Sequence, residues 1–214
     1  MNDEQTIFVV DDDETMRGSL RWLLESLRLR VQTYASAQDF LSVYDPAQPG
    51  CLVLDVRMPE ISGLELQKIL AKRQICIPII LITGHGDISM AVRGMKAGAF
   101  DFIEKPFNDQ VLLERVQQCL ALDSQQRCEV AEREKIIKRL GSLTPREAEV
   151  LDGVINGKSN KVIAAELGIS VKTVEVHRAR VMEKMAAKSV AKLTALCIAS
   201  GHIRENPEMV AGQR

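Results

Sequence analysis

The sequence lacks the features of a secreted, disulfide-bonded or zinc-binding protein. It has five cysteines, and no two of them form a Cys-x-x-Cys pair. An odd, unclustered set of cysteines argues against a disulfide framework and a zinc site, and the three histidines are too dispersed to complete one. The N-terminus has neither the basic start nor the apolar run of a signal peptide, and no apolar segment approaches the ~18 residues of a membrane span. These absences predict a reduced, cytoplasmic protein.

The charge of the chain is unevenly distributed. The net charge is −1 over 214 residues, but residues 1–125 carry a net −6 and residues 126–214 a net +5. The length suits two domains, since one domain takes roughly 100–150 residues. An acidic half followed by a basic half predicts that the second half binds a polyanion and the first binds cations.

The first half alternates short apolar runs with helical patterns. The runs are mostly apolar throughout, as expected of strands buried on both faces, with the second reading as an edge strand and the fifth weaker. They are residues 7–10, 31–34, 51–54, 79–82 and 100–103. Alternating β and α units predict an α/β fold with a doubly wound, five-stranded parallel sheet.

The second half contains only helical signals. Thr144 to Glu147 form a capping box with proline at the first helical position, and Ser159, Ser170 and Ser189 can cap three further helices. A short helix, a turn at Gly168 and a polar-faced helix are typical of a helix-turn-helix in an all-α, four-helix domain. The predicted domains are residues 1–122, a helical linker at 123–141, the helix-turn-helix domain at 142–205 and a frayed tail at 206–214.

Polar side chains follow four of the predicted strands. Asp11 and Asp12 come directly after the first, Asp55 after the third, Thr83 after the fourth and Lys105 after the fifth. Ligands gather at the carboxyl ends of parallel strands, and crowded carboxylates favour Mg²⁺. These are the groups that phosphoryl transfer to a carboxylate requires, with Asp55 as the nucleophile.

The motifs around these residues resemble the receiver domain of bacterial response regulators. The similarity lies in Val9–Asp13, Leu54–Pro59 with Gly63, Ile82-Thr83 and Glu104–Pro106, in this order across residues 5–122. It implies that Asp55 accepts phosphate from a histidine kinase. The implied Mg²⁺ ligands are Asp12, Asp55 and the backbone carbonyl of Arg57, with Asp11 acting largely through water. The implied phosphoryl-binding and switch residues are Thr83, Lys105 and Phe102.

Residues 160–178 resemble the LuxR-type helix-turn-helix of the NarL/FixJ regulators. Helical spacing places Val171, Val174, Val181, Met182 and Met185 on the buried stripe of the recognition helix. The resemblance implies binding to double-stranded DNA, and a polar face of this kind offers base and phosphate contacts. The predicted DNA-binding residues are Asn160, Lys161, Lys172, Thr173, Glu175, Val176, Arg180 and Lys184.

Two sets of alternatives stay open. Arg178 resembles a DNA contact in the FixJ branch, but helical spacing places it on the apolar stripe, where it can either extend its charged end to solvent or pair with an acid such as Glu166. A phosphohydrolase with an aspartate nucleophile shares the pocket chemistry, yet many such enzymes need a second acid where this chain has Arg57. A further alternative to a phosphorylated regulator is a receiver domain that is not phosphorylated and serves as a constitutive dimerisation module.

The chain is thus predicted to be a phosphorylation-dependent transcription regulator and not an enzyme. Phosphate on Asp55 is expected to draw Thr83 inward and to admit Phe102, which changes the surface at 87–97 and 100–103. We expect a homodimer of the phosphorylated form, because one helix-turn-helix makes few base contacts, and RNA polymerase is a further expected partner. The same surface could hold the basic domain in the unphosphorylated state.

Overall fold

The computed structural model describes residues 5–84 and 88–202, so the predicted tail at 206–214 lies outside the described residues. The chain divides into two compact units, Met1–Arg127 and Cys128–Arg214. Within the described residues, no helix is both long enough and apolar enough to cross a membrane.

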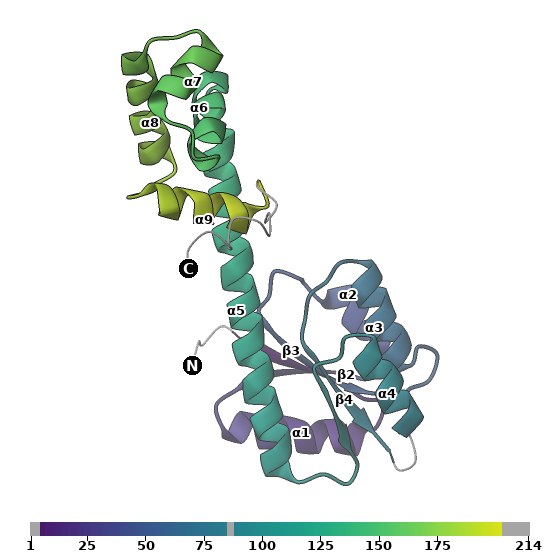
Figure 1. Ribbon diagram of the computed structural model, residues 1–214. Coiled ribbons are helices and arrows are strands. Elements are labelled where there is room, and N and C mark those ends of the chain that lie inside the picture. The colour runs from purple at the N-terminus through teal and green to yellow at the C-terminus, as the bar shows by residue number, and fades with distance from the viewer. Residues whose placement is uncertain (1–4, 85–87, 203–214) are drawn as a thin grey trace, which may run out of the picture. The chain divides into compact units, whose positions relative to one another are not determined.

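The first unit is a five-stranded parallel sheet with helices on both faces (Figure 1). The strands lie in the order β2-β1-β3-β4-β5, so the predicted edge strand is indeed at an edge. They are β1 (Thr6–Val10), β2 (Arg30–Tyr34), β3 (Gly50–Asp55), β4 (Ile79–Thr83) and β5 (Asp101–Glu104). The helices that begin in this unit are α1 (Glu14–Ser26), α2 (Ala37–Val43), α3 (Gly63–Lys72), α4 (Ile88–Lys96) and α5 (Asp109–Gly141). The predicted doubly wound parallel sheet is confirmed.

The strands are apolar throughout because both of their faces are covered. In β1, Ile7 and Val9 pack with residues of α1 and α5, whereas Phe8 and Val10 pack with residues of α2 and α3. Successive side chains of a strand point to opposite faces, so one strand serves both cores. Figure 1 shows α1 on one side of the sheet and α3 and α4 on the other.

The carboxyl ends of the central strands lie side by side. Val10 is in register with Leu54, and Asp55 with Ile82. Asp11, Asp55 and Thr83 therefore reach the same edge of the sheet, and Lys105 leaves β5 there because its backbone N–H donates to the carbonyl of Thr83. The fold thus places the predicted pocket residues at one edge.

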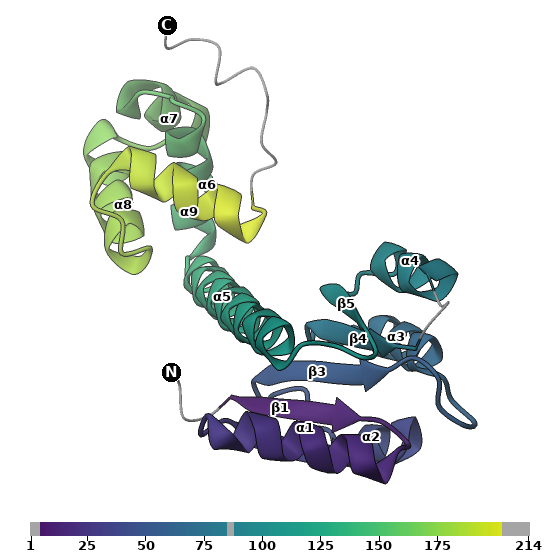
Figure 2. The same ribbon diagram turned by 90° about the horizontal axis from the view of Figure 1, so that it is seen from below.

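In the described part of the second unit, up to residue 202, four helices follow the last part of α5. They are α6 (Pro145–Ile155), α7 (Asn160–Leu167), α8 (Val171–Lys184) and α9 (Val190–Ser200). The predicted caps are confirmed: Thr144 and Glu147 form the capping box, and Ser159, Ser170 and Ser189 cap the next three helices. Figure 2 shows α6, α8 and α9 packed closely in this unit.

The turn between α7 and α8 and the core beneath it follow the predicted pattern with one exception. Gly168 has φ 66°, a left-handed conformation that glycine adopts without strain. Val174, Val181 and Met185 are buried in the core of the unit. Val171, predicted on the same stripe, is 37% exposed, because it is the first residue of α8 and extends beyond the core.

Candidate functional site

Two buried carboxylates and one lysine meet at the carboxyl edge of the sheet. Asp11 follows β1 and is 1% exposed, and Asp55 ends β3 and is 6% exposed. The Nζ of Lys105 lies 2.9 Å from Oδ2 of Asp11 and 2.5 Å from Oδ1 of Asp55. Residues 11, 55 and 105, far apart in the sequence, therefore form one hydrogen-bonded cluster, as the strand-end argument predicted.

The electrostatics of the cluster leave an excess of negative charge. Burial raises the pKa of Asp55, and the carboxylate of Asp11 adds to this effect, against the opposing hydrogen bonds from Lys105 and the backbone N–H of Arg57. Burial lowers the pKa of Lys105, but its bonds to Asp55 and Asp11 outweigh burial, so the net shift is upward. Lys105 is therefore an ammonium at neutral pH, and two carboxylates facing one ammonium can accommodate a further cation.

The predicted metal ligands are brought together only in part. Asp12 has an exposed side chain next to the buried Asp11. Among the described residues, no three His, Cys, Asp or Glu side chains are grouped closely enough to hold a metal ion by themselves. The Arg57 backbone N–H donates to Oδ2 of Asp55 at 2.6 Å, which brings the Arg57 backbone next to the cluster. The donors at this edge are carboxylate and carbonyl oxygens, and oxygen donors are those that Mg²⁺ prefers.

The two predicted switch residues lie apart from each other. Thr83 is 2% exposed at the end of β4, and its hydroxyl donates to the carbonyl of Gly84 at 3.2 Å. Phe102 lies on the edge strand β5 and is 42% exposed. A hydroxyl bonded to the neighbouring carbonyl can change partner at small cost, and the exposed ring of Phe102 has apolar area to bury if it turns inward.

Gly63 holds the start of α3 against the segment of the phosphoacceptor candidate. Its N–H donates to the carbonyl of Val56 at 3.0 Å. A Cβ on Gly63 would lie 2.2 Å from the backbone oxygen of Asp55. Close packing of two backbones therefore requires glycine here, which gives the Gly63 of the sequence motif a physical reason.

Asp13 is the N-cap of α1, and its side chain lies outside the carboxylate cluster, although its backbone N–H donates to Oδ1 of Asp11 at 2.9 Å. Its Oδ1 accepts from the backbone N–H groups of Thr15 at 2.8 Å and Met16 at 3.3 Å. This arrangement explains why the third of three consecutive acids has a different task from the first. Capping by aspartate is also favoured by the positive end of the helix dipole.

One group near the cluster had no sequence signal. Arg17, on α1, donates from Nη1 to the backbone carbonyl of Asp11 at 2.8 Å. This bond fixes the backbone at the end of β1 and adds a positive charge beside the acidic edge. The sequence distance of six residues matches no local capping or helical pairing rule, so the contact could not be foreseen.

In the second unit, α8 presents four of its six predicted DNA-binding side chains to solvent. Lys172, Glu175, Val176 and Arg180 are exposed, and so is Lys161 on α7. Val176 is 46% exposed, although it is apolar. An exposed helical face with lysine, arginine and an apolar side chain can contact both phosphates and base edges.

Thr173 and Asn160 are held by neighbours. The Thr173 hydroxyl lies 2.8 Å from that of the N-cap Ser170, and its N–H donates to Ser170 Oγ at 3.1 Å. Oδ1 of Asn160 accepts from Nη1 of Arg178 at 2.9 Å. The role of Arg178 was left open by the sequence, and the ion pair with Glu166 is not the contact it makes, because both Glu166 oxygens accept from Lys158 Nζ, at 2.7 and 2.8 Å.

Lys184 has an intramolecular role. Its Nζ lies 2.6 Å from Oε2 of Glu147 and 3.0 Å from the carbonyl of Ser142. Glu147 is only 2% exposed, and the hydrogen bond from Lys184 and that from the Thr144 N–H lower its pKa to about 2. Lys184 therefore ties α8 to the start of α6, which suits it less for contact with DNA than the exposed residues of the same helix.

Two family models match the chain. The model for the response regulator receiver domain matches residues 7–117, and the model for bacterial regulatory proteins of the luxR family matches residues 141–197. The first covers the carboxylate cluster, and the second covers most of the helical unit, including the whole of α6, α7 and α8.

Similar proteins share almost the whole length. The chain is 46% identical to the transcriptional regulatory protein TdiR of Thauera aromatica, over 88% of this chain and 83% of that protein. It is 45% identical to the transcriptional regulatory protein FixJ of Azorhizobium caulinodans, over 94% and 95%. Among solved structures, the response regulator StyR is 47% identical and covers 90% of this chain and 98% of its own, with a TM-score of 0.83.

Proposed function

The chain belongs to the response regulators that join a receiver domain to a LuxR-type DNA-binding domain, and we propose that phosphorylation of Asp55 controls its binding to promoter DNA. The phosphoryl donor would be a histidine kinase. The observation that carries the proposal is the cluster of Asp55, Asp11 and Lys105 at the carboxyl edge of the sheet.

Each residue of the cluster has a role in the proposed transfer. Asp55 Oδ1 or Oδ2 attacks the phosphorus, and the phosphoryl group leaves the histidine nitrogen of the kinase. Lys105, which now bonds both carboxylates, would bind a phosphoryl oxygen, and the hydroxyl of Thr83 would bind another. The ammonium of Lys105, which is already at the site, would thus balance negative charge on the transferred phosphoryl group.

Mg²⁺ fits the chemistry of this edge, since the excess charge is negative and the donors are oxygens. We propose that Asp12, Asp55 and the backbone carbonyl of Arg57 hold the ion and that Asp11 contributes through water. When bound, the ion neutralises the oxygens of the transferred group. On phosphorylation, Lys105 would exchange its bond to one of the two carboxylates for a bond to the phosphoryl group. The same ammonium would therefore have a negatively charged partner in both the unphosphorylated and the phosphorylated form.

The effect of phosphorylation would be transmitted to the DNA-binding domain through the surface formed by α4 and β5. Val92 and Met95 on α4 are 46% and 38% exposed, and Phe102 on β5 is 42% exposed. We name these three side chains the α4–β5 patch. When Thr83 turns to the phosphate, Phe102 would move inward and reshape this patch, which would then pair with a second copy of the chain. Part of the predicted segment 87–97 lies outside the described residues.

In DNA binding, α8 would act as the recognition helix. Lys172, Arg180 and Lys161 would contact phosphates, while Glu175 and Val176 would face base edges. A dimer would place two such helices on paired half-sites, which raises both affinity and specificity. Contact with RNA polymerase stays a prediction.

The direct test of the proposal is phosphorylation by a small donor. Incubation with acetyl phosphate and Mg²⁺ should add one phosphate to the chain, as measured by intact mass. Asp55→Asn should abolish the adduct and keep the fold, because the two side chains are nearly isosteric. Asp13→Ser is the matched control, since serine also caps helices, the Asp13 side chain lies outside the cluster, and the backbone bond of residue 13 to Asp11 does not depend on its side chain. An adduct on the Asp55→Asn variant, or none on the wild type, would overturn the proposal.

Light scattering tests the proposed link to dimerisation. We expect a monomer without acetyl phosphate and a dimer with it, at micromolar protein. Phe102→Ala should take up phosphate but dimerise less, because the patch loses its largest side chain. Equal masses of the two wild-type forms would contradict the dimer mechanism and leave the phosphorylation proposal to its own test.

A further inference from the structure

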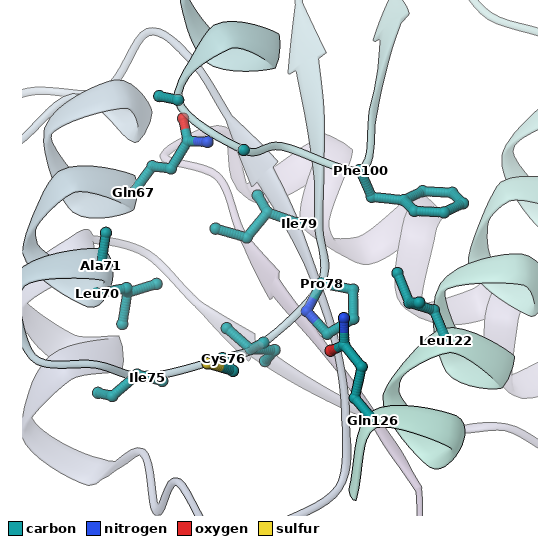
Figure 3. Close-up of a pocket in the computed structure, with 13 residues that line it drawn as sticks. Gln67, Leu70, Ala71, Ile75, Cys76, Pro78, Ile79, Phe100, Leu122 and Gln126 are labelled. Carbon is teal, nitrogen blue, oxygen red and sulfur yellow. The ribbon is translucent and has the colours of Figure 1, made fainter. Parts of the chain in front are cut away.

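Groups that bind the phosphates of DNA have to be sought in the second unit, the basic half of the chain. The hollow of the first unit at the start of β4 does not suit a phosphate. Figure 3 shows Leu70, Pro78, Phe100 and Leu122 there. Among the described residues that line this hollow, none is charged. Further DNA contacts are therefore expected around α7 and α8.

Arg178 is a cation of α8 that has no role in the proposed function. Lys172 and Arg180 on the same helix are exposed, whereas Arg178 is only partly exposed. Its Nη1 donates to Oδ1 of Asn160, the first residue of α7, at 2.9 Å. This hydrogen bond joins the two helices of the helix-turn-helix, and one of its partners is a predicted DNA-binding residue.

The position of Arg178 on α8 directs it toward α7. Successive residues of a helix are about 100° apart, so Arg178 lies roughly 200° around the helix axis from Val176. Val174 and Val181, one turn before and one turn after Arg178, are buried in the core of the unit. Arg178 is therefore on the side of α8 that packs against the unit, which does not suit it for the base edges that Val176 would face.

The bond from Arg178 determines which end of the Asn160 amide is left for DNA. A guanidinium has donors only, so Arg178 can bond the amide only through its oxygen. The other branch of the amide, Nδ2 with two N–H donors, is left for a different partner. Among the described residues, the Asn160 side chain makes no other hydrogen bond. A phosphate oxygen accepts from an N–H group, whereas it would repel the amide oxygen.

Asn160 lies where the DNA backbone is expected to pass. The first helix of a helix-turn-helix crosses the backbone while the second lies in the groove, and α7 is the first. The N-cap of α7 is Ser159, whose hydroxyl accepts from the N–H of Val162 at 3.4 Å, so capping does not require the Asn160 side chain. Lys161, beside Asn160, is exposed.

We propose that Arg178 is a positioning residue, which holds the Asn160 amide so that Nδ2 donates to a phosphate oxygen of DNA. The inference rests on the proposed DNA binding by α7 and α8. It assigns Arg178 neither a direct contact with DNA nor an acidic partner, but an action through Asn160.

A double-mutant cycle on DNA affinity tests this role. The probe is a duplex isolated from a random-sequence library by the full chain treated with acetyl phosphate, and fluorescence anisotropy measures its binding. Asn160→Ala should weaken binding about two- to tenfold, the range for one hydrogen bond, and Arg178→Met by a similar factor. The double variant should bind no more weakly than either single variant, because both remove the same contact.

Arg180→Met is the matched control for the cycle. It makes the same change at an exposed arginine of the same helix. Its loss of affinity should be the same in the Asn160→Ala background as in the wild type, because Arg180 does not act through the amide.

Replacement of single phosphates gives a readout that a merely structural role would not change. The phosphates of the duplex are replaced one at a time by uncharged methylphosphonates. One position in each half-site should matter to the wild type but not to Asn160→Ala, and Arg178→Met should be insensitive at the same position. Arg178→Lys, which keeps donors and has no acceptor, should restore the sensitivity. The comparison is made within each variant, so it holds even if a variant is less stable.

The outcomes separate this inference from the proposed function. A loss in Arg178→Met that persists in full in the Asn160→Ala background would overturn the positioning role, and so would undiminished sensitivity of Arg178→Met at the phosphate that Asn160 contacts. A wild-type chain that isolates no duplex would instead contradict the proposed DNA binding and this inference with it.

Discussion

Asp123→Ala is expected to destabilise the receiver although residue 123 was predicted to begin a linker. Asp123 is 1% exposed on α5. Its Oδ2 accepts from the backbone N–H of Gly50 at 2.9 Å, and its Oδ1 accepts from Nε of Arg127 at 2.8 Å. Arg127 also donates to three carbonyls of the loop before β3, those of residues 46, 47 and 48. One carboxylate therefore joins α5 to the start of a central strand.

The magnitude follows from what the substitution leaves unpaired. Removal of one partner of a buried ion pair costs about 3–5 kcal/mol, and a buried N–H left without an acceptor costs about 1–3 kcal/mol. The Arg127 side chain is 32% exposed, so water can replace part of its lost bond. We therefore expect a loss of about 2–4 kcal/mol, a large part of the ~5–15 kcal/mol that stabilises a typical domain.

Hydrogen exchange measured by mass spectrometry is the assay, because it resolves the receiver from the second unit. Amides of β1 and β3 should exchange roughly 30- to 1000-fold faster in Asp123→Ala, the ratio that corresponds to 2–4 kcal/mol. Amides of α6 and α8 should keep their rates. Glu134→Ala, which removes an exposed acid from the same helix, is the control and should change β3 by less than about twofold. Unchanged exchange of β3 in Asp123→Ala would refute the reasoning.

Three shorter predictions test other contacts. Gly63→Ala should lower both the thermal stability and the rate of phosphate uptake, because a Cβ there would lie 2.2 Å from a backbone oxygen; normal values of both would contradict the close packing. Lys172→Ala should weaken DNA binding less as salt rises, and Val176→Asp should weaken it more strongly, both measured by fluorescence anisotropy; unchanged affinities would mean that another face of α8 binds DNA. The pKa of Glu147 is about 2 in the folded chain against 4.5 ordinarily, so its bond with Lys184 stabilises the fold above pH 4.5 and is lost as the pH falls toward 2. The melting temperature of the wild type should fall more steeply over that window than that of Glu147→Gln, and parallel curves would count against this.

Much of the molecule was determined by local sequence. The strands were predictable because burial on both faces requires continuous apolar runs, and the helix starts because Ser, Thr and Asp accept from N–H groups two or three residues ahead. Asp13, Thr144 and Ser170 illustrate this, since each caps a helix within its own segment. The motif positions of Asp11 and Asp55 implied their meeting, because parallel strands end at one edge.

Partners that depend on packing were decided only by the tertiary structure. From the sequence, an acidic side chain was a possible partner for Arg178, but the approach of α7 to α8 makes Asn160 its hydrogen-bond partner. Lys184 has the charge of a DNA contact, yet the crossing of α8 and α6 places it against Glu147. Asp123 was predicted to lie in a helical linker, but in the structure its carboxylate is buried against the loop before β3 and accepts from the backbone N–H of Gly50. Periodicity shows which face of an element is buried, whereas the identity of a long-range partner depends on how elements approach one another, and that is a property of the whole fold.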